Sequence, residues 1–186
     1  MADIQSVTDI ITKINSFTTA VWLCPIAFTL HVIEELPRFT PWVQRHINPY
    51  FTRRHYLNVH LAGIIVAVLV AFILWLFPAR LLVFFCFTFF LTPSFFCNVF
   101  FHTGASIAYR SYSPGLLTAL FIYLPLYALI CKLAFPLGLM SGWWWLFSTI
   151  LATCVHTLEV RHNVFRFRPS TALLQETDHK SPIHFR

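Results

Sequence analysis

Apolar residues along the chain fall into five long runs, which short polar segments and proline or glycine residues separate. A helix needs about 20 mostly apolar residues to cross the hydrocarbon core of a bilayer. The runs predict membrane-spanning helices at residues 17–36, 57–77, 79–102, 115–135 and 142–159. Pro78 joins the second and third tightly, and Pro136 and Gly138 mark the turn before the fifth. We therefore predict an all-α integral membrane bundle of about five helices within residues 16–162.

The two ends of the chain have a different pattern. Residues 1–15 place apolar side chains at one helical face, which predicts a short amphipathic surface segment; these side chains are Ile4, Val7, Ile10, Ile11 and Ile14. Residues 163–186 are polar and have no apolar period, so we expect a loosely held C-terminal tail. The long lipid-facing surface of the five spans also leaves room for a homo-oligomer.

Composition supports the membrane assignment. Hydrophobic residues make up 58% of the 186 residues, charged residues only 11%, and the mean hydropathy is +0.68. A soluble domain carries about a quarter charged residues, so this chain lacks the polar surface that a water-exposed globule needs. The net charge of +6 resides in short loops, as in ordinary membrane proteins, and does not indicate nucleic-acid binding. The five cysteines form no CxxC pair, so we expect neither disulfides nor a thiolate metal site.

The basic residues divide unevenly between the two ends of the predicted spans. Of the 13 lysines and arginines, three fall on one side, Lys13, Arg80 and Lys132, and the other ten on the opposite side. Cytoplasmic loops carry the excess of basic residues, which predicts a cytoplasmic C-terminus and an N-terminus on the outer side. Trp75 and the 143–145 tryptophans then lie at the outer interface, where aromatic residues are enriched.

Ionisable residues inside the spans gather at one predicted depth, near the cytoplasmic ends of four helices. They are His31, Glu34 and Glu35 in the first, His60 in the second, His102 with Asn98 in the third, and His156 with Glu159 in the fifth. Between Asp9 and Glu176, the chain has no acidic residue other than these three glutamates. An unpaired carboxylate at membrane depth costs a few kcal/mol, so each needs a cation, a proton or a metal.

The spacing within each helix brings these side chains to one face. Glu34 and Glu35 follow His31 at i+3 and i+4, Asn98 and His102 are four residues apart, and His156 precedes Glu159 by three. Such pairs on facing helices build carboxylate–histidine metal sites in helix bundles. Imidazole and carboxylate ligands suit zinc, iron or manganese better than a thiolate-loving ion. We predict a divalent metal, with zinc favoured, held by His31, Glu34, His60, His102, His156 and Glu159.

These residues also carry a family resemblance. The segment from His31 to Glu35 reads His-Val-Ile-Glu-Glu, Asn98 and His102 follow as Asn-x-x-x-His, and Pro114-Gly115 opens the fourth span. In order, spacing and placement at helix ends, this resembles the family of small multi-pass membrane proteins named for its HXXEE motif. The resemblance implies a membrane protein with a metal-dependent or acid–base site, and it supplies no substrate.

Each residue also has a structural interpretation. The glutamates of the first span can pair with Arg38 or Arg53 at the interface, and Asn98 and His102 can simply hydrogen-bond between helices. A salt bridge with Arg161 competes for the residues of the fifth span, and His60 can be a satisfied interface residue. We expect the remaining loop histidines, His46 and His55 among them, to be solvated.

The leading functional hypothesis is a membrane hydrolase acting on a lipid or another lipophilic small molecule at the cytoplasmic leaflet. Zinc lowers the pKa of coordinated water to about 7, Glu35 would move the proton, and Asn98 would polarise a carbonyl. Lipid oxidation ranks lower because the clustered histidine boxes of membrane desaturases are absent. A proton or metal-ion transporter is the alternative, although the outer half of every span is almost wholly apolar. A non-catalytic scaffold, in which the cluster only locks the helices, is the third hypothesis.

Overall fold

The computed structural model describes residues 2–166, and the side chains from residue 7 onward. Every regular element in that range is a helix. In chain order the elements are α1 (Ala2–Glu35), α2 (Phe39–His46), α3 (Arg53–Leu76), α4 (Arg80–Cys86), η1 (Phe87–Cys97), α5 (Asn98–Ala108), α6 (Leu116–Thr118), η2 (Ala119–Tyr123), α7 (Leu124–Ala134), α8 (Gly142–Val160) and η3 (Arg161–Phe165). The predicted all-α class is confirmed.

The three η segments are stretches of π-helix that continue neighbouring α-helices. Residues 80–108 thus form one helix through α4, η1 and α5, and residues 116–134 form another through α6, η2 and α7. Pro93 lies inside η1, and Pro125 is the second residue of α7, just after η2. A proline removes an N–H from the ladder of hydrogen bonds and crowds the preceding turn, and a π-turn is one way for the helix to accommodate it.

Four helices are long and apolar enough to cross a membrane, spanning Val7–Glu35, Arg53–Leu76, Arg80–Ala108 and Leu116–Ala134. The predicted count of about five is therefore approximate. The segment predicted as the fifth span lies in α8, which is helical but is not among the four. Three tryptophans at its start and His156 and Glu159 near its end lower its hydropathy.

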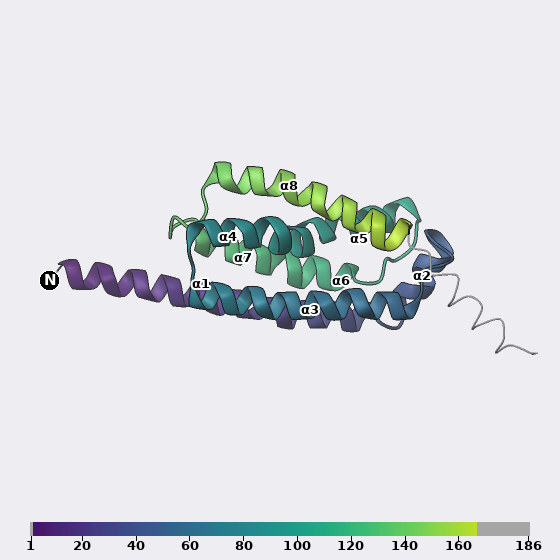
Figure 1. Ribbon diagram of the computed structural model, residues 1–186, viewed down its shortest axis with the longest axis horizontal. Helices are drawn as coiled ribbons and strands as arrows, with labels where there is room; N and C mark the ends of the chain where they lie inside the picture. The colour runs from purple at the N-terminus through teal and green to yellow at the C-terminus, as the bar shows by residue number, and fades with distance from the viewer. Residues whose placement is uncertain (1, 167–186) are drawn as a thin grey trace, which may run out of the picture.

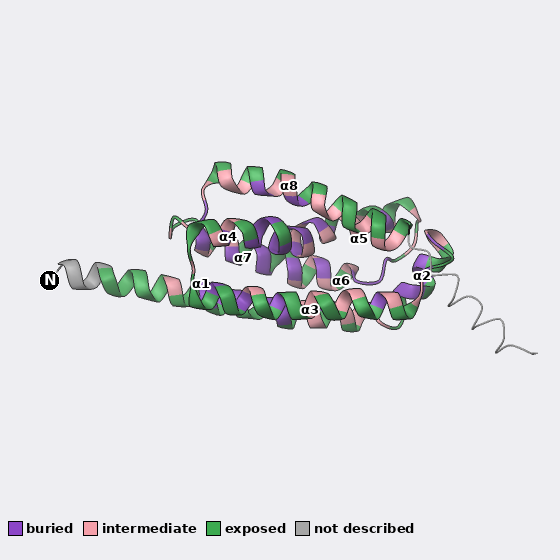
Figure 2. Cartoon of the chain, viewed as in Figure 1, coloured by how far each residue is buried: buried purple, intermediate pink, exposed green. Residues whose placement is uncertain are grey.

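The helices lie nearly parallel in an elongated bundle (Figure 1). α1 packs along α3, α8 packs along η1, and α7 lies against α1. Buried residues face the inside of this bundle and exposed ones its outside (Figure 2). Many exposed side chains around the bundle are large and apolar, for example Leu61, Phe89 and Phe121. Such a surface suits lipid rather than water, as expected of a membrane protein.

The N-terminal part of α1 extends beyond the other helices as a single helix (Figure 1). Val7, Ile10 and Ile11 are each about half exposed there, at 53%, 52% and 53%. The helix continues without a break from this segment through the predicted first span. Most of the predicted C-terminal tail, residues 167–186, lies outside the described residues.

The apolar core consists of two clusters of buried residues. The larger apolar cluster runs along the bundle axis and includes Phe17, Leu74, Phe87 and Ile130. The smaller cluster lies around α2 and contains Phe39, Trp42, Val43, Phe51, Tyr56 and Ala105. His31 and Glu35 lie in the last turns of α1, just before α2 begins at Phe39. These two residues therefore lie near the boundary between the larger cluster and the smaller one.

Candidate metal centre

The centre is organised around the Glu35 carboxylate, in the last turn of α1. Glu35 is 1% exposed, and His31, one helical turn earlier, is 2% exposed. The Nε2 atom of His31 lies 3.6 Å from Oε1 of Glu35. The i, i+4 spacing places both side chains on the inner face of α1, as the sequence pattern predicts.

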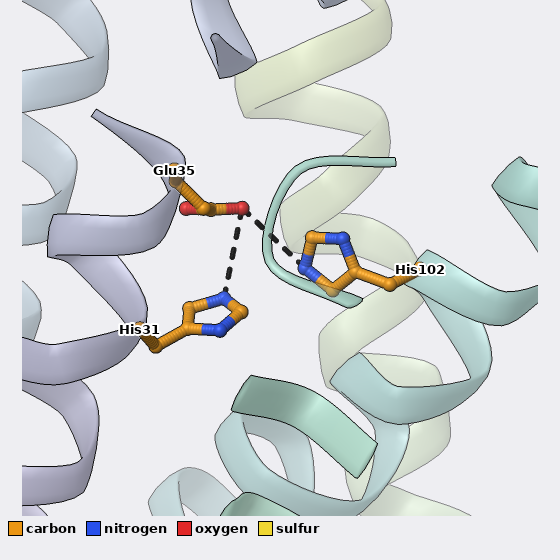
Figure 3. A group of neighbouring side chains, drawn as sticks. All are labelled: His31, Glu35 and His102. Carbon is orange, nitrogen blue, oxygen red and sulfur yellow. Dashed lines mark ion pairs between the residues drawn. The ribbon is translucent and has the colours of Figure 1, made fainter. Parts of the chain in front are cut away.

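Two more imidazoles reach the same carboxylate from other helices. Nε2 of His102 in α5 lies 3.4 Å from Oε1 of Glu35, and Nε2 of His60 in α3 lies 3.0 Å from Oε2. Figure 3 shows the rings of His31 and His102 near the same oxygen of Glu35, with dashed lines for the two ion pairs. Residues distant in sequence thus meet at one buried carboxylate.

The opposite nitrogen of each ring is anchored to the protein. Nδ1 of His31 lies 2.7 Å from Oγ1 of Thr118, and Nδ1 of His102 lies 3.0 Å from Oγ of Ser113. Nδ1 of His60 donates to the backbone carbonyl of Tyr56 at 2.8 Å. Metal-binding histidines generally have such outer partners, which fix the ring orientation and leave the other nitrogen free to bind.

Glu34 lies next to Glu35 in sequence, but its carboxylate binds the 112–118 segment rather than the imidazoles. Its carboxylate accepts hydrogen bonds from the backbone N–H groups of Gly115, Leu117 and Thr118, at 3.0, 3.3 and 2.8 Å. It also accepts from the hydroxyl groups of Thr118, at 2.6 Å, and Tyr112. The carboxylate therefore satisfies the free N–H groups at the start of the helix formed by residues 116–134.

Glu34 is also linked to His31 through the hydroxyl group of Thr118. The Thr118 hydroxyl has one proton, and the Glu34 carboxylate is the acceptor nearest to it. Because this proton is donated to Glu34, the Thr118 hydroxyl oxygen accepts a hydrogen bond from Nδ1–H of His31. In this arrangement the Nε2 lone pair of His31 faces Glu35 and His102, and the amide nitrogen of Asn98 donates to it at 3.1 Å. Glu34 is thus an outer partner of His31.

Gly115 lies directly over the cluster. Its φ of +99° belongs to the left-handed region, which glycine adopts without the strain that a side chain brings. A Cβ atom at this position would lie 2.7 Å from Cε1 of both His31 and His102, and 2.9 Å from Oε1 of Glu35. The backbone of the Pro114-Gly115 turn therefore approaches the imidazoles so closely that only a glycine fits.

The cluster opens into a cavity of about 530 Å³. Its polar lining includes the cluster residues His31, Glu35, His60, Asn98 and His102, and Tyr56 adds a hydroxyl that donates to Oε2 of Glu35 at 3.2 Å. The rest of the lining is mostly apolar and comes from α1, α2 and the segment after it, α3, η1, α5, α8 and η3. The predicted proximity of the first three spans at this depth is therefore present in the structure.

The residues of α8 line this cavity but do not join the cluster. His156 and Glu159 both contribute to the wall, and neither belongs to the group whose ligand atoms lie close together. Nε2 of His156 is buried without a hydrogen-bond partner in the part of the chain that the structure describes. Its ring contacts Phe101 edge-on, with 6.4 Å between centroids.

The ion pairs with arginine that the sequence also allowed are not observed among the described residues. Glu35 pairs with His31, His60 and His102, and Glu34 with the 112–118 loop, so neither carboxylate forms a salt bridge with Arg38 or Arg53. Three contributors were not predicted from the sequence: Tyr56, Ser113 and Thr118. The Pro114-Gly115 turn is the sequence feature that points to the last two.

The donor set fits a divalent metal ion. One nitrogen each of His31 and His102 and one oxygen of Glu35 lie within 4.8 Å of one another. Ligands at about 2.1 Å from a tetrahedral ion are about 3.4 Å apart. The distances from Oε1 of Glu35 to Nε2 of His102 and Nε2 of His31, 3.4 and 3.6 Å, are close to this value. Two imidazoles and one carboxylate occur in catalytic zinc sites and in non-haem iron sites, so the donors do not identify the metal.

Comparison with known proteins assigns the chain to a family. Residues 22–131 match the family described as "Protein of unknown function with HXXEE motif". The match includes all three clustered residues, Glu34 and the Pro114-Gly115 turn, and it ends before α8. Searches of curated proteins and of solved structures gave no match. Because the matched segment covers more than half of the sequence, the chain belongs to the HXXEE-motif family.

Proposed function

We propose that this protein is a metal-dependent membrane enzyme that hydrolyses a lipophilic substrate, with His31, Glu35 and His102 as metal ligands. The observation that carries the proposal is the convergence of imidazole Nε2 atoms on one buried carboxylate, with every Nδ1 atom anchored. A cluster that only locked helices together would not need a cavity of about 530 Å³ beside it.

The walls of the cavity support a lipophilic substrate. Phe28, Val66 and Phe90 extend its lining from the cluster toward the middle of the bundle. Its two side walls come from α3 and α8, which pack against α1 and η1 respectively. A substrate dissolved in the bilayer would approach between α3 and α8, and its polar group would meet the histidines.

The roles of the residues follow from their contacts. A bound zinc ion would supply Lewis-acid activation of water and of a substrate carbonyl. His60 is suited to hold and release a proton at Nε2, because its Nδ1–H is already donated to the Tyr56 carbonyl. The amide N–H of Asn98 faces the same space and would donate to a carbonyl oxygen of the substrate.

In this proposal both glutamates have roles different from those that we expected from the sequence. Glu35 is the better ligand because it lies among the imidazoles, whereas all of the hydrogen bonds of Glu34 go to Tyr112 and residues 115–118. Glu34 then acts as a positioning residue through Thr118. His156 and Glu159 would shape the substrate cavity rather than bind the metal.

The location of the site is also part of the proposal. His31 and Glu35 lie in the last turns of α1, and the next residues along the chain, from the turn after α1 through α2 to the start of α3, carry Arg38, Arg45, Arg53 and Arg54. An excess of basic residues is typical of cytoplasmic loops. We therefore propose that the substrate is taken from the cytoplasmic leaflet.

The direct test is elemental analysis of protein purified in mild detergent. We expect about one zinc per chain in the wild type, and less than about a tenth of that in His31→Ala and His102→Ala, because a two-ligand site binds metal weakly. His162→Ala is the matched control, because His162 is an exposed histidine outside the cavity.

Activity is measured on the same preparations with fluorogenic long-chain esters and amides in mixed micelles. Hydrolysis should require the metal, stop on chelation and return with added zinc. If all forms fold and none of them contains metal, the metal site is refuted. Metal binding without hydrolysis across the panel would refute the enzyme and leave the site. Proton or metal-ion flux into proteoliposomes would favour the transporter instead.

A further inference from the structure

A second hollow lies on the other side of α8, outside the proposed active site. It has a volume of about 710 Å³ and lies between the η1–α5 helix and the α8–η3 helix. Its lining residues are Phe96, Cys97, Phe100, Phe101, Thr153, His156, Thr157, Val160, Arg161, Phe165 and Arg166. Most of this surface is apolar, and both cations come from the same end, at η3.

The threonine hydroxyl groups within the apolar part already have hydrogen-bond acceptors. The hydroxyl groups of Thr153 and Thr157 donate to the carbonyl oxygens of Thr149 and Thr153, at 2.8 and 2.7 Å. These threonines therefore offer the groove methyl groups, and hydroxyl groups whose protons are already donated. Phe100, on the facing wall, is 62% exposed. Such a surface suits a hydrocarbon chain better than a polar ligand.

The π-helix brings the two arginines to one site. In an α-helix, residues five apart point about 140° away from each other. In η3 the hydrogen bonds run from residue i+5 to residue i, and the N–H of Arg166 bonds to the carbonyl of Arg161 at 2.9 Å. The two side chains consequently share one face, and both line the groove. Neither forms a salt bridge within the described part of the chain.

We propose that this groove binds an anionic phospholipid, with the acyl chain along Phe96, Phe100 and Thr157 and the phosphate between Arg161 and Arg166. Two arginines that form no salt bridge with a described residue lie at the polar end of an apolar groove, and they complement a molecule with one negative head group and a long tail. Guanidinium groups match phosphate oxygens in charge and geometry. Basic pockets between membrane helices on the cytoplasmic side bind anionic head groups in this manner.

The two hollows share a wall, formed by Phe101, His156 and Val160. A lipid in the groove would pack against the outer side of this wall. The proposal does not depend on the enzyme, however, because the groove contains none of the residues that would bind the metal.

The test uses the full chain in nanodiscs of phosphatidylcholine, with phosphatidylglycerol as the anionic probe. Binding is followed by native mass spectrometry of lipid adducts and by the rise in the thermal unfolding temperature with phosphatidylglycerol content. We expect the double substitution Arg161→Gln/Arg166→Gln to weaken phosphatidylglycerol binding about 30-fold, and to leave phosphatidylcholine binding unchanged.

The control is Arg53→Gln/Arg54→Gln, which removes the same charge from two exposed arginines that line neither hollow. We expect this variant to bind phosphatidylglycerol within about threefold of the wild type. A second variant, Thr157→Phe, fills the apolar part and should weaken binding while both arginines remain.

Three results would overturn the proposal. They are a wild type that does not prefer phosphatidylglycerol to phosphatidylcholine, an equal loss of binding in the two arginine pairs, and unchanged binding in Arg161→Gln/Arg166→Gln. Metal content is measured on the same samples. It tests the proposed active site, whereas phosphatidylglycerol binding tests the groove, so failure of one proposal can be told from failure of the other.

Discussion

Two groups of buried polar side chains lie in this bundle, and they differ in what their polar atoms face. Near the middle of the bundle, the hydroxyls of Thr88 and Ser148 pair at 3.0 Å, and Thr92 pairs with Tyr127 at 2.9 Å. At the α2 end, three imidazoles face one carboxylate beside a cavity. We refer to these as the hydroxyl pairs and the histidine cluster.

The hydroxyl pairs are neutral and complete. Thr88 donates to the carbonyl of Phe84 or to Ser148, and the Tyr127 oxygen also accepts from Nε1 of Trp145 at 3.1 Å. Such pairs hold membrane helices together and need no ligand. In the histidine cluster, by contrast, the Nε2 atoms of three rings share one carboxylate. Burial of polar groups alone therefore does not identify a site; convergent donors next to a cavity do.

The strongest test of this difference compares the two neighbouring glutamates. Glu35→Gln should abolish stoichiometric metal binding while the protein still folds, because an amide oxygen is a much weaker ligand than a carboxylate. Glu34→Gln should lower the free energy of unfolding by about 2 kcal/mol, because it weakens charged hydrogen bonds to the 115–118 segment. Because Glu34 contacts His31 only through Thr118, Glu34→Gln should weaken metal affinity by only about 10- to 100-fold.

Metal titration and thermal unfolding in detergent measure both quantities on each variant. The opposite pattern, with metal lost in Glu34→Gln and retained in Glu35→Gln, would restore the ligand assignment that we made from the sequence.

The next effect in size concerns the turn over the histidine cluster. Gly115→Ala should cost about 3 kcal/mol of stability, from left-handed backbone strain and from contact with His31 and His102. It should also reduce metal binding. Gly138→Ala is the matched control, since Gly138 also has a positive φ, +66°, but open space around its Cβ position. We expect a cost of about 1 kcal/mol there and unchanged metal content. Equal losses in both variants would mean that backbone strain alone explains the result.

A smaller effect is expected at the hydroxyl pairs. Thr92→Val or Tyr127→Phe should each lower the free energy of unfolding by about 1 kcal/mol, because each leaves a buried partner without its hydrogen bond. Metal content should not change in either. Thr149→Val is the control, because its hydroxyl bonds only to the carbonyl of Trp145 in its own helix. A double-mutant cycle gives the coupling between Thr92 and Tyr127, and loss of metal in these variants would contradict the distinction between the two groups.

The sequence predicted the parts of the cluster that helical periodicity determines. Glu35 lies one turn after His31, and His102 one turn after Asn98, so each pair had to share a face. Apolar runs likewise predicted the spans, although α8 is too rich in tryptophan and polar residues to meet the same standard. Both predictions depend only on residues that are close in sequence.

The choice between Glu34 and Glu35 could not be made in this way. Positions i+3 and i+4 both lie near the face of His31, so local spacing allows either carboxylate. What separates them is the path of the 112–118 segment, which offers free N–H groups to Glu34 and none to Glu35. That path depends on the positive φ of Gly115 and on packing between helices that are about 80 residues apart. Ser113 and Thr118 were missed for the same reason.

The smallest expected effect is at the rim of the cluster, where Tyr112 donates to Glu34 from the loop outside the spans. Partial burial, and then the hydrogen bond to Glu34, raise the pKa of Tyr112 to about 12. A raised pKa in the folded state stabilises the fold fully below the unfolded value of about 10, and this contribution disappears as the pH rises toward 12.

Tyr112→Phe should therefore cost about 0.5 kcal/mol between pH 7 and 9, a small amount because the ring is 42% exposed. Thermal unfolding of both forms from pH 7 to 11 should show their difference shrinking above pH 10, whereas a constant difference would mean that the hydroxyl does not interact with Glu34. Because Tyr112 contacts Glu34 and not the histidines, metal content should stay unchanged throughout, which separates support of the loop from ligation of the metal.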